Sequence, residues 1–216
     1  SYINFDKEDK KSYMKGKGKV DNNGNGNVTF PNSGLLLDSI IMAHELGHMS
    51  NRPTNNEQIS IMSEAVALYT ELQFYDYLLK LGYKAEVLFF KNIRLKDTSK
   101  LSKLYSNSIS ILLTYIKYGA VTEKNFNCLF PEKNYFEVLN RIESNEDFYT
   151  ISMGMNYVFG FVMATFLKRK VDEDFSYTEN INILNKRLNN SDFTENLRIL
   201  GISNFDYESI NYISSY

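Results

Sequence analysis

The chain of 216 residues contains two histidines, His44 and His48, and they stand four residues apart. Residues at positions i and i+4 lie one turn apart on the same face of an α-helix. The surrounding segment, residues 34–50, is rich in leucine and isoleucine, so we expect a mostly buried helix there. Ser33 favours a helix start before this segment, and Pro53 favours its end. The two imidazoles are therefore predicted to lie together on one face of a buried helix.

The fold class expected for the whole chain is mainly α. Two short extended pieces, residues 17–20 and 27–30, flank the turn-forming run at residues 21–24. They predict a small β-hairpin or edge strand before the helix of the histidines. Most of the later helical patterns are bounded by glycine or proline. We expect these helices at about residues 57–81, 84–96, 99–118, 132–143, from 151 onward, 177–188, 193–200 and 207–213.

The length fits one domain. We expect a single domain over residues 1–216, with any seam near Gly82 or Gly119, where helical patterns end. The chain begins at Ser1 and not at Met, which leaves open that an N-terminal portion of a longer protein is missing. The first twenty residues are charged and lack the apolar core of a secretory signal, which favours a cytoplasmic location. Secretion stays an alternative, because processing can remove such a signal.

Charge and cysteine content argue against several other classes. The chain has 24 Lys and Arg against 26 Asp and Glu, so a strongly basic nucleic-acid binder is not expected. Its single cysteine, Cys128, can form neither an internal disulfide nor a cysteine metal cluster. The uncharged stretch at residues 151–167 is barely long enough to cross a membrane and contains polar residues and two glycines. We expect it to be a buried core helix, and we expect no membrane span.

The run His44-Glu45-Leu46-Gly47-His48 has the HExxH pattern of zinc hydrolases. Two imidazoles one turn apart can grip one metal ion, and Glu45 beside the first of them can reach a metal-bound water. Zinc is therefore the expected cofactor. A catalytic zinc site takes three protein ligands and keeps a position open for water. HExxH also arises by chance on surface helices, but here it lies in an apolar segment and uses both histidines of the chain.

The third ligand must come from another residue type, because no histidine or cysteine pair remains. Glu57, Glu64 and Glu71 follow at intervals of seven and share one face of the next predicted helix. We assign Glu64 as the third ligand, and we assign Glu71 to hold the far nitrogen of a ligand histidine. Glu57 is a weaker choice of ligand because it lies near the helix start. An ordinary ion pair is the alternative role for Glu71.

These residues resemble a known group. The segment from Ile41 to His48, followed by Ser63-Glu64-Ala65-Val66-Ala67 and by Glu71, is similar to the thimet oligopeptidase and oligoendopeptidase F family of gluzincin metallopeptidases. The resemblance covers roughly residues 27–75 and implies a zincin-like helical metallopeptidase domain. It also implies that His44, His48 and Glu64 bind zinc and that Glu45 activates water. The upstream residues Asn27, Val28, Thr29 and Phe30 are similar to the family's extended segment before the metal helix.

The chain also departs from that family. The gap between His48 and Glu64 is shorter than usual, and the family's downstream histidine is absent. The downstream counterpart here is the segment 155–161, in which Phe161 occupies the position of the family's tyrosine that stabilises the transition state. Tyr157, one helical turn earlier, is our substitute, with Tyr149 as another candidate and simple packing as the alternative role for both.

The expected function is a zinc-dependent peptidase that acts on a peptide substrate. Glu45 would be the general base, and Tyr157 would donate a hydrogen bond to the developing oxyanion. Asn27, Val28, Thr29 and Phe30 would pair with an extended substrate through their backbone. Two alternatives stay open: a non-catalytic zinc-binding helical module of a larger protein, and a secreted endopeptidase with a specific protein target.

Overall fold

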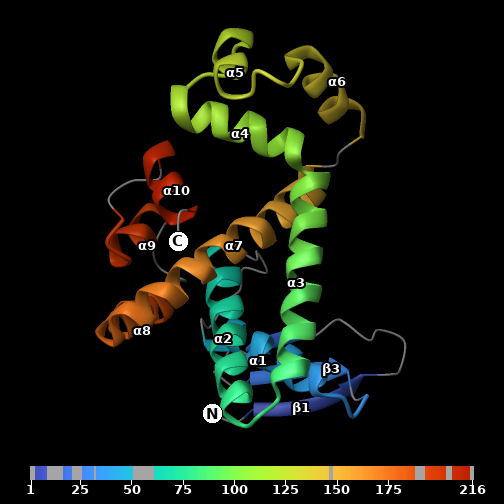
Figure 1. The fold of residues 1–216 in the computed structure, drawn as a ribbon, viewed down its shortest axis with the longest axis vertical. Coiled ribbons are helices and arrows are strands. Elements are labelled where there is room, and N and C mark those ends of the chain that lie inside the picture. The colour runs from blue at the N-terminus through green and yellow to red at the C-terminus, as the bar shows by residue number, and fades with distance from the viewer. Residues whose placement is uncertain are drawn as a thin grey trace.

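The computed structural model describes residues 3–8, 17–20, 26–31, 33–50, 61–145, 148–187, 193–202 and 206–214, and these are mainly helical, as predicted. Figure 1 shows a small sheet at one end of the molecule and the short helices α4, α5 and α6 at the other. The long helix α3 runs between these two ends, and α7 crosses the middle. Residues 51–60, which include Glu57, lie outside the described residues.

The sheet has three strands in the order β1-β3-β2, namely β1 (Ile3–Glu8), β2 (Lys17–Val20) and β3 (Gly26–Pro31). β2 and β3 pair antiparallel, as the predicted hairpin requires, whereas β1 pairs parallel to the other edge of β3. Of the two expected arrangements, the hairpin is therefore confirmed, and an edge strand at residues 27–30 is wrong because β3 lies between β1 and β2. The run at residues 3–8 is charged, and it was not recognised as a strand from the sequence.

Helix α1 (Leu36–Ser50) carries both histidines and packs against β2 and β3. Its start is fixed by Asp38, whose carboxylate accepts hydrogen bonds from the backbone N–H groups of Ser33 and Gly34 and from the Ser33 hydroxyl. These hydrogen bonds tie the segment just before the helix to its first turn. Helix α1 therefore begins two residues later than the sequence pattern predicted.

The core of the molecule lies where α2 (Ile61–Lys80) packs against both α1 and α7 (Phe148–Glu173). The segment 151–167 belongs to α7, and its residues Met163, Ala164, Phe166 and Leu167 are buried in this core, as predicted. Four short elements complete the C-terminal side: η1 (Phe175–Tyr177), α8 (Thr178–Arg187), α9 (Phe193–Ile199) and α10 (Tyr207–Ser214). No helix among the described residues has both the length and the apolar character needed to cross a membrane.

Residues 84–145 form a helical extension that we call the arm. It consists of α3 (Lys84–Leu104), α4 (Ser106–Tyr118), α5 (Glu123–Leu129) and α6 (Tyr135–Asn145). The predicted break at residues 96–99 is wrong, because α3 continues to Leu104. Helix α5 was missed: it has only seven residues, and the Thr122 side chain caps it by accepting from the Asn125 N–H.

Candidate metal centre

Helices α1 and α2 bring three potential metal ligands together. The Nε2 atom of His44 lies 3.7 Å from Oε2 of Glu64, and Nε2 of His48 lies 3.4 Å from Oε1 of the same residue. One ligand atom from each of the three residues lies within 4.8 Å of the others. Zinc bonds of 2.0–2.2 Å in a tetrahedral arrangement separate neighbouring ligand atoms by about 3.4 Å. The three residues therefore have a spacing that fits a single zinc ion.

The Glu64 carboxylate is the strongest sign that a cation belongs at this place. Glu64 is fully buried, and neither of its oxygens has a hydrogen-bond partner among the described residues. Burying an ionised carboxylate is costly unless it is paired or coordinates a metal. A zinc ion held between this carboxylate and the two imidazoles would supply the missing interaction.

The local charge also favours a cation. The carboxylates of Glu45, Glu64 and Glu71 bring three negative charges, whereas the nearby Arg94 brings one positive charge. Burial lowers the pKa of His48, but the carboxylates of Glu64 and Glu45 outweigh that effect and raise the pKa above its usual value. The cluster therefore attracts positive charge even without an ion.

Two glycines set the spacing of the helices around Glu64. A Cβ atom added to Gly47 of α1 would lie 2.6 Å from Cα of Ala67 in α2. A Cβ atom added to Gly160 of α7 would lie 2.6 Å from Cβ of Glu64. Both distances are too short for any side chain, so these glycines allow α1 and α7 to approach α2 closely. The backbone geometry, and not a flexible side chain, thus places Glu64 between its neighbours.

The far nitrogens of both histidines face polar groups. Nδ1 of His44 lies 3.4 Å from Oε2 of Glu71, a close contact without hydrogen-bond geometry. Nδ1 of His48 lies 3.0 Å from the Ser63 hydroxyl oxygen, at hydrogen-bonding distance. Outer partners of this kind orient metal-ligating histidines. The structure thus brings Glu71 to the position that the sequence assigned to it.

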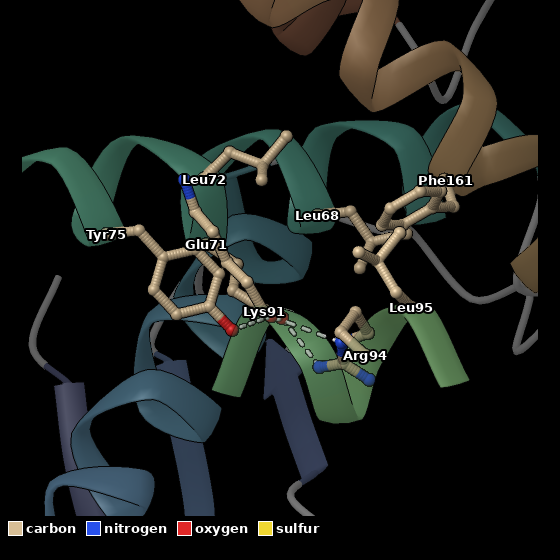
Figure 2. Close-up of a pocket in the computed structure, with 8 residues that line it drawn as sticks. All are labelled: Leu68, Glu71, Leu72, Tyr75, Lys91, Arg94, Leu95 and Phe161. Atoms are coloured by element: carbon tan, nitrogen blue, oxygen red, sulfur yellow. Dashed lines mark hydrogen bonds and ion pairs between the residues drawn. The ribbon is translucent and has the colours of Figure 1, made fainter. Parts of the chain in front are cut away.

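Glu71 is itself held by two further side chains, drawn in Figure 2. The Tyr75 hydroxyl donates to Oε1 at 2.6 Å, while Nε and Nη2 of Arg94 donate to Oε1 and Oε2 at 3.1 and 2.6 Å. Burial would raise the pKa of the Glu71 carboxyl, but contact with His44 and the charge and hydrogen bonds of Arg94 hold that pKa at about 2. Glu71 therefore stays ionised, and its ion pair with Arg94 matches the alternative role that the sequence left open.

Ser63, Tyr75 and Arg94 were not predicted as site residues. Ser63 and Tyr75 lie on the helix that carries Glu64 and Glu71, and Tyr75 stands four residues after Glu71, so helical spacing could have suggested both. Arg94 had no sequence signal of this kind. It lies 23 residues after Glu71 on α3, and only the folded structure brings the two together.

The charges of the cluster act on Tyr157, the proposed oxyanion donor. Burial raises the pKa of Tyr157 to about 12, the charges of Glu64 and Glu45 add to the rise, and Arg94 opposes it. The Tyr157 hydroxyl therefore remains protonated near neutral pH and can act as a hydrogen-bond donor. Glu45 is buried on α1 between the two histidines in sequence. The side chain of Tyr149, the other candidate donor, lies outside the described residues.

The predicted substrate strand needs a correction. Asn27, Val28, Thr29 and Phe30 belong to β3, the central strand, and each of them is in register with β1. Asn27, Val28 and Thr29 also pair with β2. A backbone edge that is already paired cannot accept a further strand. Pairing of an extended substrate with Asn27, Val28 and Thr29 is therefore wrong, because β1 and β2 already occupy both edges of β3 there.

Comparison with known proteins adds no relative. No family model, no curated protein and no solved structure gives a significant match to this chain. The resemblance to the oligopeptidase family therefore rests on the motif residues alone.

Proposed function

We propose that the protein is a zinc-dependent peptidase with a zincin-like metal centre. The observation that carries this proposal is the buried Glu64 carboxylate, whose oxygens lie near Nε2 of His44 and Nε2 of His48 and accept no hydrogen bond from the described residues. Glu45 directly follows the first of these histidines in the sequence and completes the HExxH pattern. This set of residue types is the one that zinc hydrolases use.

His44, His48 and Glu64 would hold the ion. When bound there, zinc polarises the carbonyl of the bond to be cut and lowers the pKa of the attacking water toward ~7. Glu71 and Ser63 keep the two imidazoles oriented through their far nitrogens.

Glu45 is the proposed general base. Its carboxylate would take a proton from the attacking water and then pass that proton to the leaving amine. Tyr157 would donate its hydroxyl proton in a hydrogen bond to the oxygen that becomes negatively charged. One such donor contributes on the order of 3 kcal/mol to transition-state stabilisation.

A purely structural zinc site is the second candidate. Structural sites are usually closed by four protein ligands, whereas catalytic sites use three and leave one position open. Among the described residues the cluster offers three ligands, which supports catalysis over a closed structural site.

The decisive experiment replaces Glu45 by Gln. We expect Glu45→Gln to retain one zinc ion per chain, measured by elemental analysis, because Glu45 is not a proposed ligand. Cleavage of a mixed peptide library, followed by mass spectrometry, should fall by at least about 100-fold. Glu86→Gln, an exposed position on α3, is the control and should cleave like the wild type.

Three outcomes would separate the candidates. Loss of cleavage with retained zinc supports the peptidase. Equal cleavage by wild type and Glu45→Gln would show that the proposed mechanism is wrong. Zinc bound at one ion per chain, with no cleavage even by the wild type, would favour the non-catalytic zinc module.

A further inference from the structure

A cavity of about 130 Å³ lies where α2, α3 and α7 meet, and Glu71 separates it from the metal cluster. Figure 2 shows the side chains that surround it. Its walls are almost entirely apolar, and the charged groups lie on α2 and α3. The lining residues are Leu68, Glu71, Leu72, Tyr75, Lys91, Arg94, Leu95 and Phe161.

The volume and the walls fit one small apolar group. An apolar cavity of 150 Å³ lined by Leu, Ile and Phe stays dry and binds benzene. A cavity of about 130 Å³ lined by leucines and Phe161 therefore has room for one side chain the size of leucine. Leu95 on the α3 side is half exposed, so a ligand could enter from the surface there.

The polar groups of the wall select against a cationic occupant. Both oxygens of Glu71 are engaged by Tyr75 and Arg94, so this carboxylate is already paired. Lys91 adds a positive charge, with its Nζ atom 5.6 Å from the centre of the Tyr75 ring. A cationic side chain would meet Lys91 and Arg94, while Glu71, the one carboxylate among the described lining residues, is already engaged.

Two residues connect the cavity to the surroundings of the metal cluster. Glu71 lines it and also contacts Nδ1 of His44 at 3.4 Å. Phe161 lines it from α7 and directly follows Gly160, which packs against Glu64. A peptide with one bond at the metal carries its neighbouring side chains only a few ångströms away, since successive Cα atoms are about 3.8 Å apart.

We propose that this cavity is the pocket for one apolar, leucine-sized side chain of a peptide bound across the metal centre. The inference rests on the proposed peptidase function and adds the substrate class to it: peptides with an aliphatic residue near the bond that is cut. Lysine and arginine at that position are disfavoured by Lys91 and Arg94.

The test measures binding without cleavage, using the whole chain. N-acetyl-leucinamide, N-acetyl-alaninamide and N-acetyl-lysinamide are titrated into the protein, and binding is followed by the methyl NMR signals of the leucines. We expect the leucine derivative to bind at least about tenfold more tightly than the alanine derivative, because it buries three more carbon atoms. The lysine derivative should bind no better than the alanine derivative.

A pair of variants on α3 locates the binding. Leu95→Trp fills the mouth of the cavity and should weaken binding of the leucine derivative at least about tenfold. Leu88→Trp is the matched control, since Leu88 stands two turns earlier with 52% exposure, against 51% for Leu95, and does not line the cavity. It should change the affinity less than about twofold, and circular dichroism checks that both variants fold.

Equal binding of the leucine and alanine derivatives would overturn the proposal, and so would undiminished binding by a folded Leu95→Trp variant. Neither result depends on zinc or on turnover. A protein that binds the leucine derivative selectively but cleaves nothing would keep the pocket and contradict the peptidase. A protein that cleaves peptides but lacks this selectivity would support the peptidase and contradict the pocket.

Discussion

Helices α2 and α3 are almost equal in length, at 20 and 21 residues, yet they lie in opposite environments. Helix α2 buries ten of its residues, including Glu64 and Glu71, whereas α3 buries only Val87. Large apolar side chains on α3, such as Leu88, Phe89 and Leu104, are more than half exposed. Helix α2 is the more apolar of the two, but the exposed leucines and phenylalanine of α3 show that an apolar side chain alone does not ensure burial.

Small residues add to the difference between the two helices. Helix α2 presents Ala65 and Ala67 to its neighbours, and it faces Gly47 of α1 and Gly160 of α7. Close backbone approach excludes water from Glu64 and makes its charge expensive without a cation. The arm lacks such an approach along most of α3, and its side chains remain in contact with solvent. We call the packing of α1 and α7 against α2 around Glu64 the junction, and we expect the function to lie there. Three variants test whether the junction and the arm differ as described.

The largest expected effect is the loss of metal binding on changing Glu64. Apparent zinc-binding free energies of 10–16 kcal/mol are shared among the ligands, so Glu64→Gln should weaken zinc binding by roughly a thousandfold. Competition with a chelating dye measures the affinity. Glu86→Gln on α3 is the control and should leave the affinity unchanged. Zinc binding by Glu64→Gln at wild-type strength would mean that the junction is not a metal centre.

The next effect concerns Arg94, which joins the arm to the junction. Arg94→Met leaves the buried Glu71 carboxylate without its guanidinium partner and should lower the free energy of unfolding by about 3 kcal/mol. Zinc affinity should fall by about 10- to 100-fold, because Glu71 orients His44. Urea denaturation and zinc titration measure the two effects.

Arg141→Met is the matched control for Arg94. Arg141 forms an exposed ion pair with Glu137 on α6, one turn away on the same helix. Exposed pairs of this kind contribute about 0.5 kcal/mol or less. Equal destabilisation by the two variants would contradict a special role for the Arg94 ion pair.

The smallest of the three effects concerns Gly160. Alanine normally stabilises a helix by about 1 kcal/mol relative to glycine, but Gly160→Ala places a methyl group against Glu64 and should destabilise the protein by about 1–3 kcal/mol. Thermal unfolding measures the change. Leu88→Ala on the arm should stay within about 0.5 kcal/mol of the wild type. A stabilising Gly160→Ala would show that α7 has room to move away from α2.

Much of the fold could be predicted because helix periodicity and helix ends are local properties. The helices at residues 36–50 and 178–187 fit the patterns within a few residues. Strand β1 was missed, and β3 was taken for an edge, since strand pairing depends on segments far apart in the chain. The long α3 was split because its exposed residues give no apolar stripe to follow.

The metal ligands could be proposed from the sequence for the same local reason. His44 and His48 are one turn apart, and Glu64 and Glu71 are two turns apart on one helix. Arg94 and the cavity beside it were out of reach, because they exist only where α2, α3 and α7 meet. Gly160 carried no signal either, since its role appears only when Glu64 lies against it.

The ion pair between Arg94 and Glu71 also couples the stability of the arm to zinc binding. If holding Glu71 through Arg94 strengthens zinc binding, then zinc must strengthen that contact by the same factor, since such coupling is reciprocal. Zinc would then slow amide hydrogen exchange around Arg94 in α3, a helix that carries none of the three proposed ligands. Hydrogen exchange in the arm would in this way depend on an ion that the arm does not bind.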